Sequence, residues 1–248
     1  MSGQPTRAGP SPAPTNAARR LPLPATWRRF GAFLRRPVLP DRADLSPGPA
    51  ARAVLVLFAL DLALMAAVLG GIGLASALGL ELPDHLLNGF TLTPIMVAFI
   101  VAGAPIGEEI VFRGWLSGRP GHILAVLALL AGAAAIVLYP GSLLAGGALA
   151  AAFVLAGALL FALRKRPALG AFQRHFPWFF YASALLFAGV HLSNFAGASP
   201  ALLPLVLPQF VLALLLGYLR VRHGLLAGIA LHMLHNALFA GLMLAGSG

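Results

Sequence analysis

Two adjacent carboxylates and an arginine, Glu108, Glu109 and Arg113, lie near the end of a long apolar run. The chain has only seven acidic residues, and ionised side chains inside a membrane segment are costly and usually persist because function requires them. On a helix, Glu109 and Arg113 are i,i+4 neighbours and can pair. Glu108 is rotated by about 100° from Glu109, so it has no partner within its own helix and is free to face another group.

Two further apolar segments carry ionisable or amide side chains. His191 follows Phe187 by four residues, and His232 precedes Asn236 by four residues, so each pair shares one helix face. A carboxylate can activate water, imidazoles can hold water or a metal ion, and an amide can stabilise a developing oxyanion. Together these residues predict hydrolysis of a polar bond within the membrane.

Each group taken alone also has a purely structural interpretation. A membrane histidine often only hydrogen-bonds a neighbouring helix, and Glu109 with Arg113 can form a clamp near the membrane edge. Asp61 is either a polar contact between helices or a functional residue, and His235 is assigned no role. Any one of these groups could be structural, but three of them are less expected to occur together by accident. We therefore favour a catalytic role.

The composition is that of a polytopic membrane protein. Of 248 residues, 59% are hydrophobic and 10% are charged, with a mean hydropathy of +0.88; soluble domains carry about 25% charged residues. The absence of cysteine excludes thiolate metal sites, a cysteine nucleophile and disulfides. The net charge of +10 could indicate nucleic-acid binding. Nine of the 17 basic residues precede residue 53, however, and the others lie in short loops, which indicates membrane topology and contact with anionic lipid instead.

The apolar segments predict seven transmembrane helices, each near the roughly 20 residues needed to cross a bilayer. They cover about 53–79, 94–116, 122–139, 143–163, 177–195, 200–219 and 224–245. The alternate loops 80–93, 140–142 and 196–199 contain no Lys or Arg, so all basic residues share one side. The positive-inside rule places that side, with the N-terminus, in the cytoplasm. We expect a multi-pass protein of the plasma (inner) membrane.

The first 50 residues differ from the membrane domain, 51–248. Residues up to about Ala25 are rich in Pro, Ala, Ser and Arg and predict a disordered basic region. Residues 26–36 place Trp27, Phe30 and Leu34 on one side with arginines around them. This pattern is typical of a short interfacial helix or of a basic stop beside a transmembrane helix.

Three motifs on successive membrane segments resemble the CPBP intramembrane protease family. They are Glu-Glu-x-x-x-Arg at 108–113, Phe-x-x-x-His at 187–191 and His-x-x-x-Asn at 232–236. The family includes type II CAAX prenyl endopeptidases, Abi proteins and lysostaphin-resistance-like proteins. The segment Tyr218–Leu225 is similar to the family's usual lead-in to the third motif, and the resemblance covers about 90–245.

The resemblance implies an all-α bundle with a catalytic core of four helices, here segments two, five, six and seven. Segments three and four then form an inserted hairpin. Because a hairpin crosses the membrane an even number of times, it preserves the orientation of everything downstream. Gly103–Gly107 should weaken or kink segment two. At a rise of about 1.5 Å per residue, Glu108 lies about 8 Å and His191 about 21 Å from the cytoplasmic boundary of the membrane. A kink or tilt of a helix is therefore needed to bring both residues into one site.

The resemblance also implies a role for each motif residue. Glu108 would activate water, with Glu109 and Arg113 as its supporting pair. His191 would position water or a metal ion, and His232 and Asn236 would stabilise the oxyanion. Two forms of the site stay open: zinc held by Glu108, His191 and His232, or a glutamate mechanism without metal.

The expected function is therefore an intramembrane endopeptidase, with a membrane-embedded or lipidated substrate such as a prenylated CAAX peptide and no nucleic-acid partner. One alternative is a non-catalytic immunity or scaffold protein that has kept the motifs. A second is a transporter, which would also place Glu, Arg and His within helices. A transporter predicts internal repeats, and none is found in the sequence.

Overall fold

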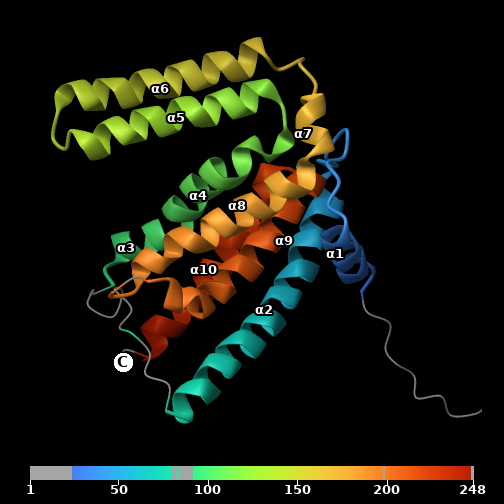
Figure 1. Cartoon of the computed structure of the whole chain (residues 1–248), viewed down its shortest axis with the longest axis vertical. Coiled ribbons are helices and arrows are strands. Elements are labelled where there is room, and N and C mark those ends of the chain that lie inside the picture. The colour runs from blue at the N-terminus through green and yellow to red at the C-terminus, as the bar shows by residue number, and fades with distance from the viewer. Residues whose placement is uncertain (1–23, 80–82, 84–91, 198, 247–248) are drawn as a thin grey trace, which may run out of the picture.

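The computed structural model describes residues 24–79, 83, 92–197 and 199–246, and all regular elements within these ranges are helices (Figure 1). The α-helices are α1 (Ala25–Arg35), α2 (Pro47–Ala77), α3 (Pro94–Ala98), α4 (Ala104–Arg113), α5 (Pro120–Leu138), α6 (Leu143–Ala162), α7 (Gly170–Arg174), α8 (Phe176–Val190), α9 (Leu207–His223) and α10 (Leu225–Gly246). A π-helix, η2 (Phe99–Gly103), and three 3₁₀ helices, η3 (Gly114–Ser117), η4 (His191–Asn194) and η5 (Pro200–Val206), complete the order. The all-α prediction is confirmed. Most of the region predicted to be disordered, residues 1–23, lies outside the described residues.

Seven helical stretches in the described part of the chain are long and apolar enough to cross a membrane. They are Pro47–Ala77, Pro94–Ser117, Pro120–Leu138, Leu143–Ala162, Phe176–Asn194, Leu202–His223 and Leu225–Ala245. The predicted seven segments and the multi-pass membrane class are confirmed. Which membrane holds the protein, and on which side its N-terminus lies, stay predictions.

Two boundaries of the membrane stretches differ from the predicted ones by more than two residues. The first membrane-spanning helix, α2, begins at Pro47 instead of about residue 53. Proline fits the first turn of a helix, because the N–H there would be unpaired anyway. The sixth stretch runs to His223 instead of 219, and Gly224 ends it with φ +90°, a conformation that favours glycine. Arg220 and Arg222 therefore belong to the last turn of α9 and not to a loop.

The core is the bundle of α4, α8, α9 and α10, with α9 at its centre. Nearly every residue of α9 from Leu212 to Val221 is buried, so the helix is enclosed on all sides there. Phe176 and Phe180 of α8 are fully buried against it. A Cβ atom on Gly217 would lie 2.8 Å from the Phe180 ring, so only glycine allows α8 and α9 to approach this closely.

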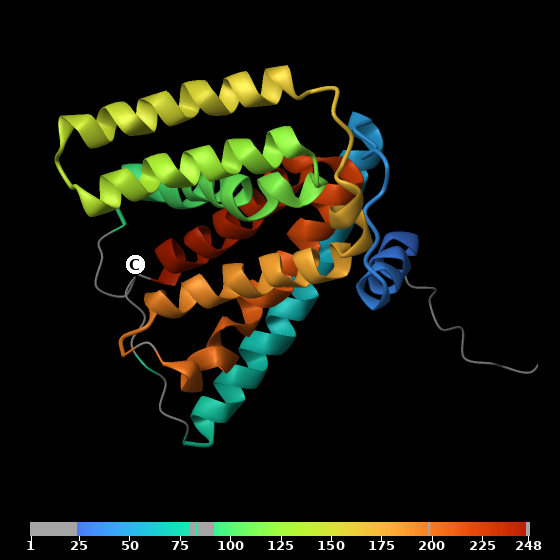
Figure 2. The ribbon, with the colours of Figure 1, turned by 45° about the horizontal axis from the view of Figure 1, so that its top comes forward.

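Helices α5 and α6 form a hairpin where the sequence predicts one; that the hairpin is an insertion stays a prediction. They pack along each other and lie as a separate layer beside the bundle in both views (Figures 1 and 2). A Cβ atom on Gly132 would lie 2.7 Å from the Cβ of Ala152, so small residues let the two helices meet. The hairpin meets the core chiefly through the start of α5, near η3 and α4. The core is therefore assembled without a contribution from the middle of the insertion.

The irregularity in the second membrane stretch lies one turn before the predicted position. Instead of a kink over Gly103–Gly107, the chain forms the π-helix η2 and continues directly into α4. The N–H of Ala104 bonds to the carbonyl of Phe99, five residues back. The next residue, Pro105, has no N–H, so the carbonyl of Ile100 loses the donor that would follow in this pattern. The sequence feature that we expected to bend the helix instead leaves one carbonyl without a partner in its own helix.

Helix α2, which carries Asp61, packs against α9 and α10. Asp61 is fully buried, and its Oδ2 lies 2.7 Å from Nδ1 of His235 in α10. The other oxygen of Asp61, Oδ1, has no hydrogen-bond partner in the described part of the chain. Of the two interpretations of Asp61, the contact between helices is therefore the one that the structure shows. His235, which had no assigned role, is its partner.

We expect Asp61→Leu and His235→Phe each to lower the melting temperature of the purified protein. Each change leaves a buried polar group without its partner, which costs about 3–5 kcal/mol. The double variant should recover much of the loss, because an apolar pair of similar volume can replace a buried ion pair. Thermal unfolding of the four proteins in one detergent gives the coupling; additive losses would contradict a direct interaction.

Candidate active site

Glu109 is the most enclosed group of the site. Its side chain is fully buried, and its Oε1 lies 2.8 Å from Nη1 of Arg113, so the i,i+4 pair forms. The same oxygen lies 3.1 Å from Nδ1 of His232 in α10. The other oxygen, Oε2, packs close to Gly228, where a Cβ atom would lie 3.1 Å away. One carboxylate thus joins the first and third motifs across two helices.

Glu108 lies in a different environment. Its side chain is 31% accessible, compared with 0% for Glu109. Its Oε2 lies 3.7 Å from Nε2 of His232, which is beyond hydrogen-bond distance. The helix turn between the two glutamates therefore separates them as the sequence predicts: Glu109 points into the bundle, and Glu108 can still meet a molecule from outside.

His232 stands between the two glutamates and is almost fully buried. Since Nδ1 faces the Glu109 carboxylate, this nitrogen carries a proton and donates it. Nε2 is then directed towards Glu108. Imidazoles that donate one N–H to a carboxylate have a fixed tautomer and ring orientation. Glu109 therefore determines which nitrogen of His232 is presented to Glu108.

The second motif meets the first through the ring of Phe187. The guanidinium of Arg113 lies 4.0 Å from the centre of this ring, a cation–π contact inside the bundle. The ring also lies edge-on to His232, with 5.8 Å between centroids, and 4.5 Å from the centroid of His191. His191 does not join the Glu109–Arg113–His232 network directly. Its Nδ1 lies 2.7 Å from the carbonyl of Phe187, so it donates there and leaves Nε2 available.

Asn236 supplies the hydrogen-bond donor that the carbonyl of Ile100 lacks in its own helix. Its Nδ2 donates to the carbonyl of Ile100 at 2.8 Å, the same carbonyl that loses its donor because of Pro105. An amide NH₂ carries two hydrogens, so this contact leaves the second one free. Asn236 therefore ties α10 to η2 and keeps a donor for another acceptor.

Two residues that the sequence did not single out, and a third that it placed in a motif, position this site. Arg220, taken as a positive-inside charge, is buried and donates from Nε to the carbonyl of Arg113 and from Nη2 to that of Gly114, each at 2.9 Å. These carbonyls lie where α4 passes into η3, so Arg220 holds this end of the helix. Ser183 donates to the carbonyl of Phe112 at 2.7 Å and joins α8 to α4. The third is Phe187, the first residue of the second motif, to which the sequence analysis assigned no separate role. The one available signal for Arg220 was its place in the segment resembling the family's lead-in.

The residues predicted to hold zinc are of the right type but are not gathered. In the part of the chain that the structure describes, no group of three or more His, Cys, Asp or Glu side chains is placed to hold a metal ion. Glu108 and His232 are neighbours, and His191 packs against the ring of Phe187. As placed here, the three described side chains do not form a three-ligand zinc site.

The contact between Asn236 and Ile100 can be tested by giving the carbonyl another donor. We expect Asn236→Ala to lower the melting temperature, because it leaves the partly buried carbonyl of Ile100 unpaired, at a cost of about 1–3 kcal/mol. Pro105→Ala restores an N–H that can reach Ile100. In that background Asn236→Ala should cost clearly less. An equal loss of melting temperature in both backgrounds would show that the carbonyl does not depend on Asn236.

One of three comparisons with known proteins found a match. The family model described as type II CAAX prenyl endopeptidase Rce1-like matches residues 90–238, more than half of the chain, and the match contains all three motifs. A search of curated proteins found no match, and a search of solved structures found none. The chain belongs to the type II CAAX prenyl endopeptidase Rce1-like family, a family of membrane proteases.

Proposed function

We propose that this protein is an intramembrane endopeptidase that uses Glu108 to activate water and hydrolyses a peptide bond of a membrane-associated substrate. The observation that carries the proposal is the separation of two adjacent glutamates. Glu109 is fully buried and neutralised by Arg113, whereas Glu108 is accessible and faces Nε2 of His232. A structural clamp would require only the buried pair. An accessible carboxylate beside an oriented imidazole is what general-base catalysis requires.

A water molecule fits between the reacting groups in this proposal. Two atoms 3.7 Å apart, Glu108 Oε2 and His232 Nε2, can both lie about 2.8 Å from one oxygen placed beside them. Glu108 removes a proton from this water, and the hydroxide attacks the peptide carbonyl carbon. Nε2 of His232 accepts a hydrogen bond from the water, and the resulting oxyanion accepts one from the free N–H of Asn236. Glu108 then passes its proton to the departing amine as the C–N bond breaks.

The other motif residues keep this arrangement in place. Arg113 offsets the charge of Glu109, so a second ionised carboxylate can exist next to Glu108 inside the bundle. Glu109 fixes the tautomer of His232. His191 has its Nε2 available and assists in holding the water or the substrate. The family match supports a prenylated CAAX-type peptide as the substrate class. The distribution of basic residues supports an N-terminus in the cytoplasm and a place in the plasma (inner) membrane.

The proposal predicts that Glu108→Gln removes activity without destabilising the protein. Loss of the general base should reduce cleavage about 10²- to 10⁴-fold. The melting temperature should stay close to the parent's, because the nearest polar contact of Glu108 is longer than a hydrogen bond. The matched control is Glu109→Gln on the same helix, which should lower both activity and melting temperature. The measurement is peptide profiling of detergent-purified protein, including farnesylated CAAX peptides. Undiminished cleavage by Glu108→Gln would refute the mechanism, and absence of any cleavage by the parent would favour a scaffold.

A second prediction concerns metal removal. Because the described His, Asp and Glu side chains are not gathered around a metal position, cleavage should survive dialysis against a chelator such as 1,10-phenanthroline. Metal content, measured on the same sample, confirms that removal was complete. Activity that disappears on chelation and returns with added zinc would contradict the metal-free mechanism and support zinc ligation by Glu108, His191 and His232.

A further inference from the structure

A second polar site lies at the end of the bundle where α9 terminates, away from the motif residues. It is a pocket of about 550 Å³ around four arginines, Arg29, Arg36, Arg42 and Arg222. Tyr218 and His223 of α9 also line it. None of these residues takes part in the proposed hydrolysis. We call it the arginine pocket.

The walls of the arginine pocket are fixed by contacts within the chain. Helix α1 is held by a hydrogen bond of 2.7 Å from the indole of Trp27 to the carbonyl of Val56, and by one from the Tyr181 hydroxyl to the carbonyl of Leu34. Phe33 of α1 is buried edge-on against Phe180 and Tyr218. The pocket is therefore a built feature and not a chance gathering of mobile side chains.

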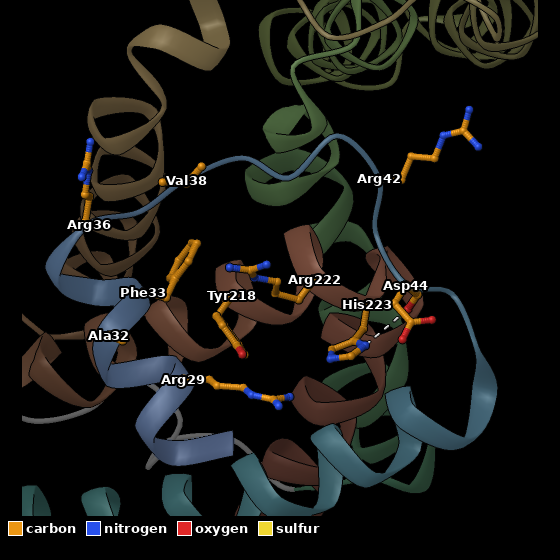
Figure 3. Close-up of a pocket in the computed structure, with 10 residues that line it drawn as sticks. All are labelled: Arg29, Ala32, Phe33, Arg36, Val38, Arg42, Asp44, Tyr218, Arg222 and His223. Carbon is orange, nitrogen blue, oxygen red and sulfur yellow. Dashed lines mark hydrogen bonds between the residues drawn. The ribbon is translucent and has the colours of Figure 1, made fainter. Parts of the chain in front are cut away.

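The segment after α1 closes the pocket. Figure 3 shows α1 on one side, α9 behind, and the chain from Arg36 to Asp44 arching over both. The N–H of Asp44 donates to the carbonyl of Arg222 at 2.8 Å, which fastens the far end of this segment to α9. Arg29, Arg222 and the Tyr218 hydroxyl lie around the middle of the hollow, and Arg36 and Arg42 stand at opposite edges (Figure 3).

No acidic side chain of the described residues forms an ion pair with the four arginines of the pocket. Within the described residues the ion pairs join Glu109 to Arg113, both glutamates to His232, and Asp61 to His235, so none includes these four arginines. The acidic residue in the lining is Asp44. Hydrogen bonds from Ser46 lower the pKa of the Asp44 carboxyl, which is therefore ionised and already engaged. Four arginines around one aspartate leave room for an anion.

The apolar part of the lining indicates what kind of anion. Ala32, Phe33 and Val38 share the pocket with the arginines, and Val38 is exposed. A free phosphate ion gains no binding energy from apolar contacts. A phospholipid, in contrast, presents its phosphate next to hydrocarbon. Guanidinium groups bind phosphate through paired hydrogen bonds. The pocket also lies at the ends of membrane helices, on the side that the basic residues predict to be cytoplasmic, where anionic lipids attract arginine.

We propose that the arginine pocket binds the phosphate headgroup of an anionic phospholipid, with Arg29 and Arg222 as its principal ligands and the Tyr218 hydroxyl as a further donor. Bound there, the lipid bridges α1 to α9 and stabilises the cover formed by the N-terminal segment. The site does not depend on the proposed peptidase activity. A failure of one proposal would therefore leave the other intact.

The test is lipid retention by the full chain, delipidated in detergent and then mixed with phosphatidylglycerol or phosphatidylcholine. Native mass spectrometry and thermal shift report the binding. We expect phosphatidylglycerol to bind and to raise the melting temperature, with little effect of phosphatidylcholine. Arg29→Gln/Arg222→Gln should weaken phosphatidylglycerol binding about tenfold. The control is Arg35→Gln/Arg174→Gln, which removes the same charge from exposed arginines outside the pocket and should change binding less than twofold.

Three results would overturn the proposal. Equal losses in the two double variants would mean diffuse surface charge. Unchanged retention by Arg29→Gln/Arg222→Gln would exclude these ligands. Inorganic phosphate that displaces the lipid at millimolar concentration and binds equally well alone would show a free-anion site instead. If the double variant does not fold, as judged by size exclusion, Arg29→Gln alone replaces it, with an expected loss of about threefold against Arg35→Gln on the same helix.

Discussion

The carboxylate of Glu109 has no access to solvent and depends entirely on the protein around it. Arg113 supplies a positive charge at 2.8 Å, and His232 supplies a donor at 3.1 Å. An ionised carboxylate can exist inside a membrane bundle only with such partners, because the hydrocarbon around it cannot solvate the charge. The contact of Glu109 with His232 joins α4 to α10. The cation–π contact of Arg113 with Phe187 joins α4 to α8. The arrangement of three helices thus follows from satisfying one buried charge.

A second tie between the same parts of the chain comes from the backbone. Pro105 and the π-helix leave the carbonyl of Ile100 unpaired, and Asn236 supplies its donor. The two ties lie about one turn apart on α10, at His232 and Asn236, so together they set both the height and the rotation of that helix. The proposed catalysis requires this control, because Nε2 of His232 must stay near Glu108 while the substrate enters. The π-helix therefore contributes to the positioning of the site.

Around this centre the chain adds helices α1 and α2, which the family match does not cover, and the hairpin α5–α6, which lies within the matched residues. Helix α2 packs against α9 and α10 and places Asp61 on His235, three residues from His232. Helix α1 and the segment after it cover the end of α9 and form the arginine pocket. The hairpin α5–α6 extends sideways instead. The N-terminal elements thus support the catalytic bundle from two directions, whereas the insertion leaves it unchanged.

The sequence by itself determined the class of fold and the separation of the two glutamates. Seven spans follow from hydrophobic length, and the different directions of Glu108 and Glu109 follow from helix geometry, since both depend only on local composition and spacing. Tertiary structure alone decided the partners. The contact of His232 with Glu109, the hydrogen bond of Asn236 to Ile100 and the burial of Arg220 against the end of α4 join residues up to 136 positions apart. Such contacts depend on how helices are rotated and stacked, which residue spacing along one helix does not specify.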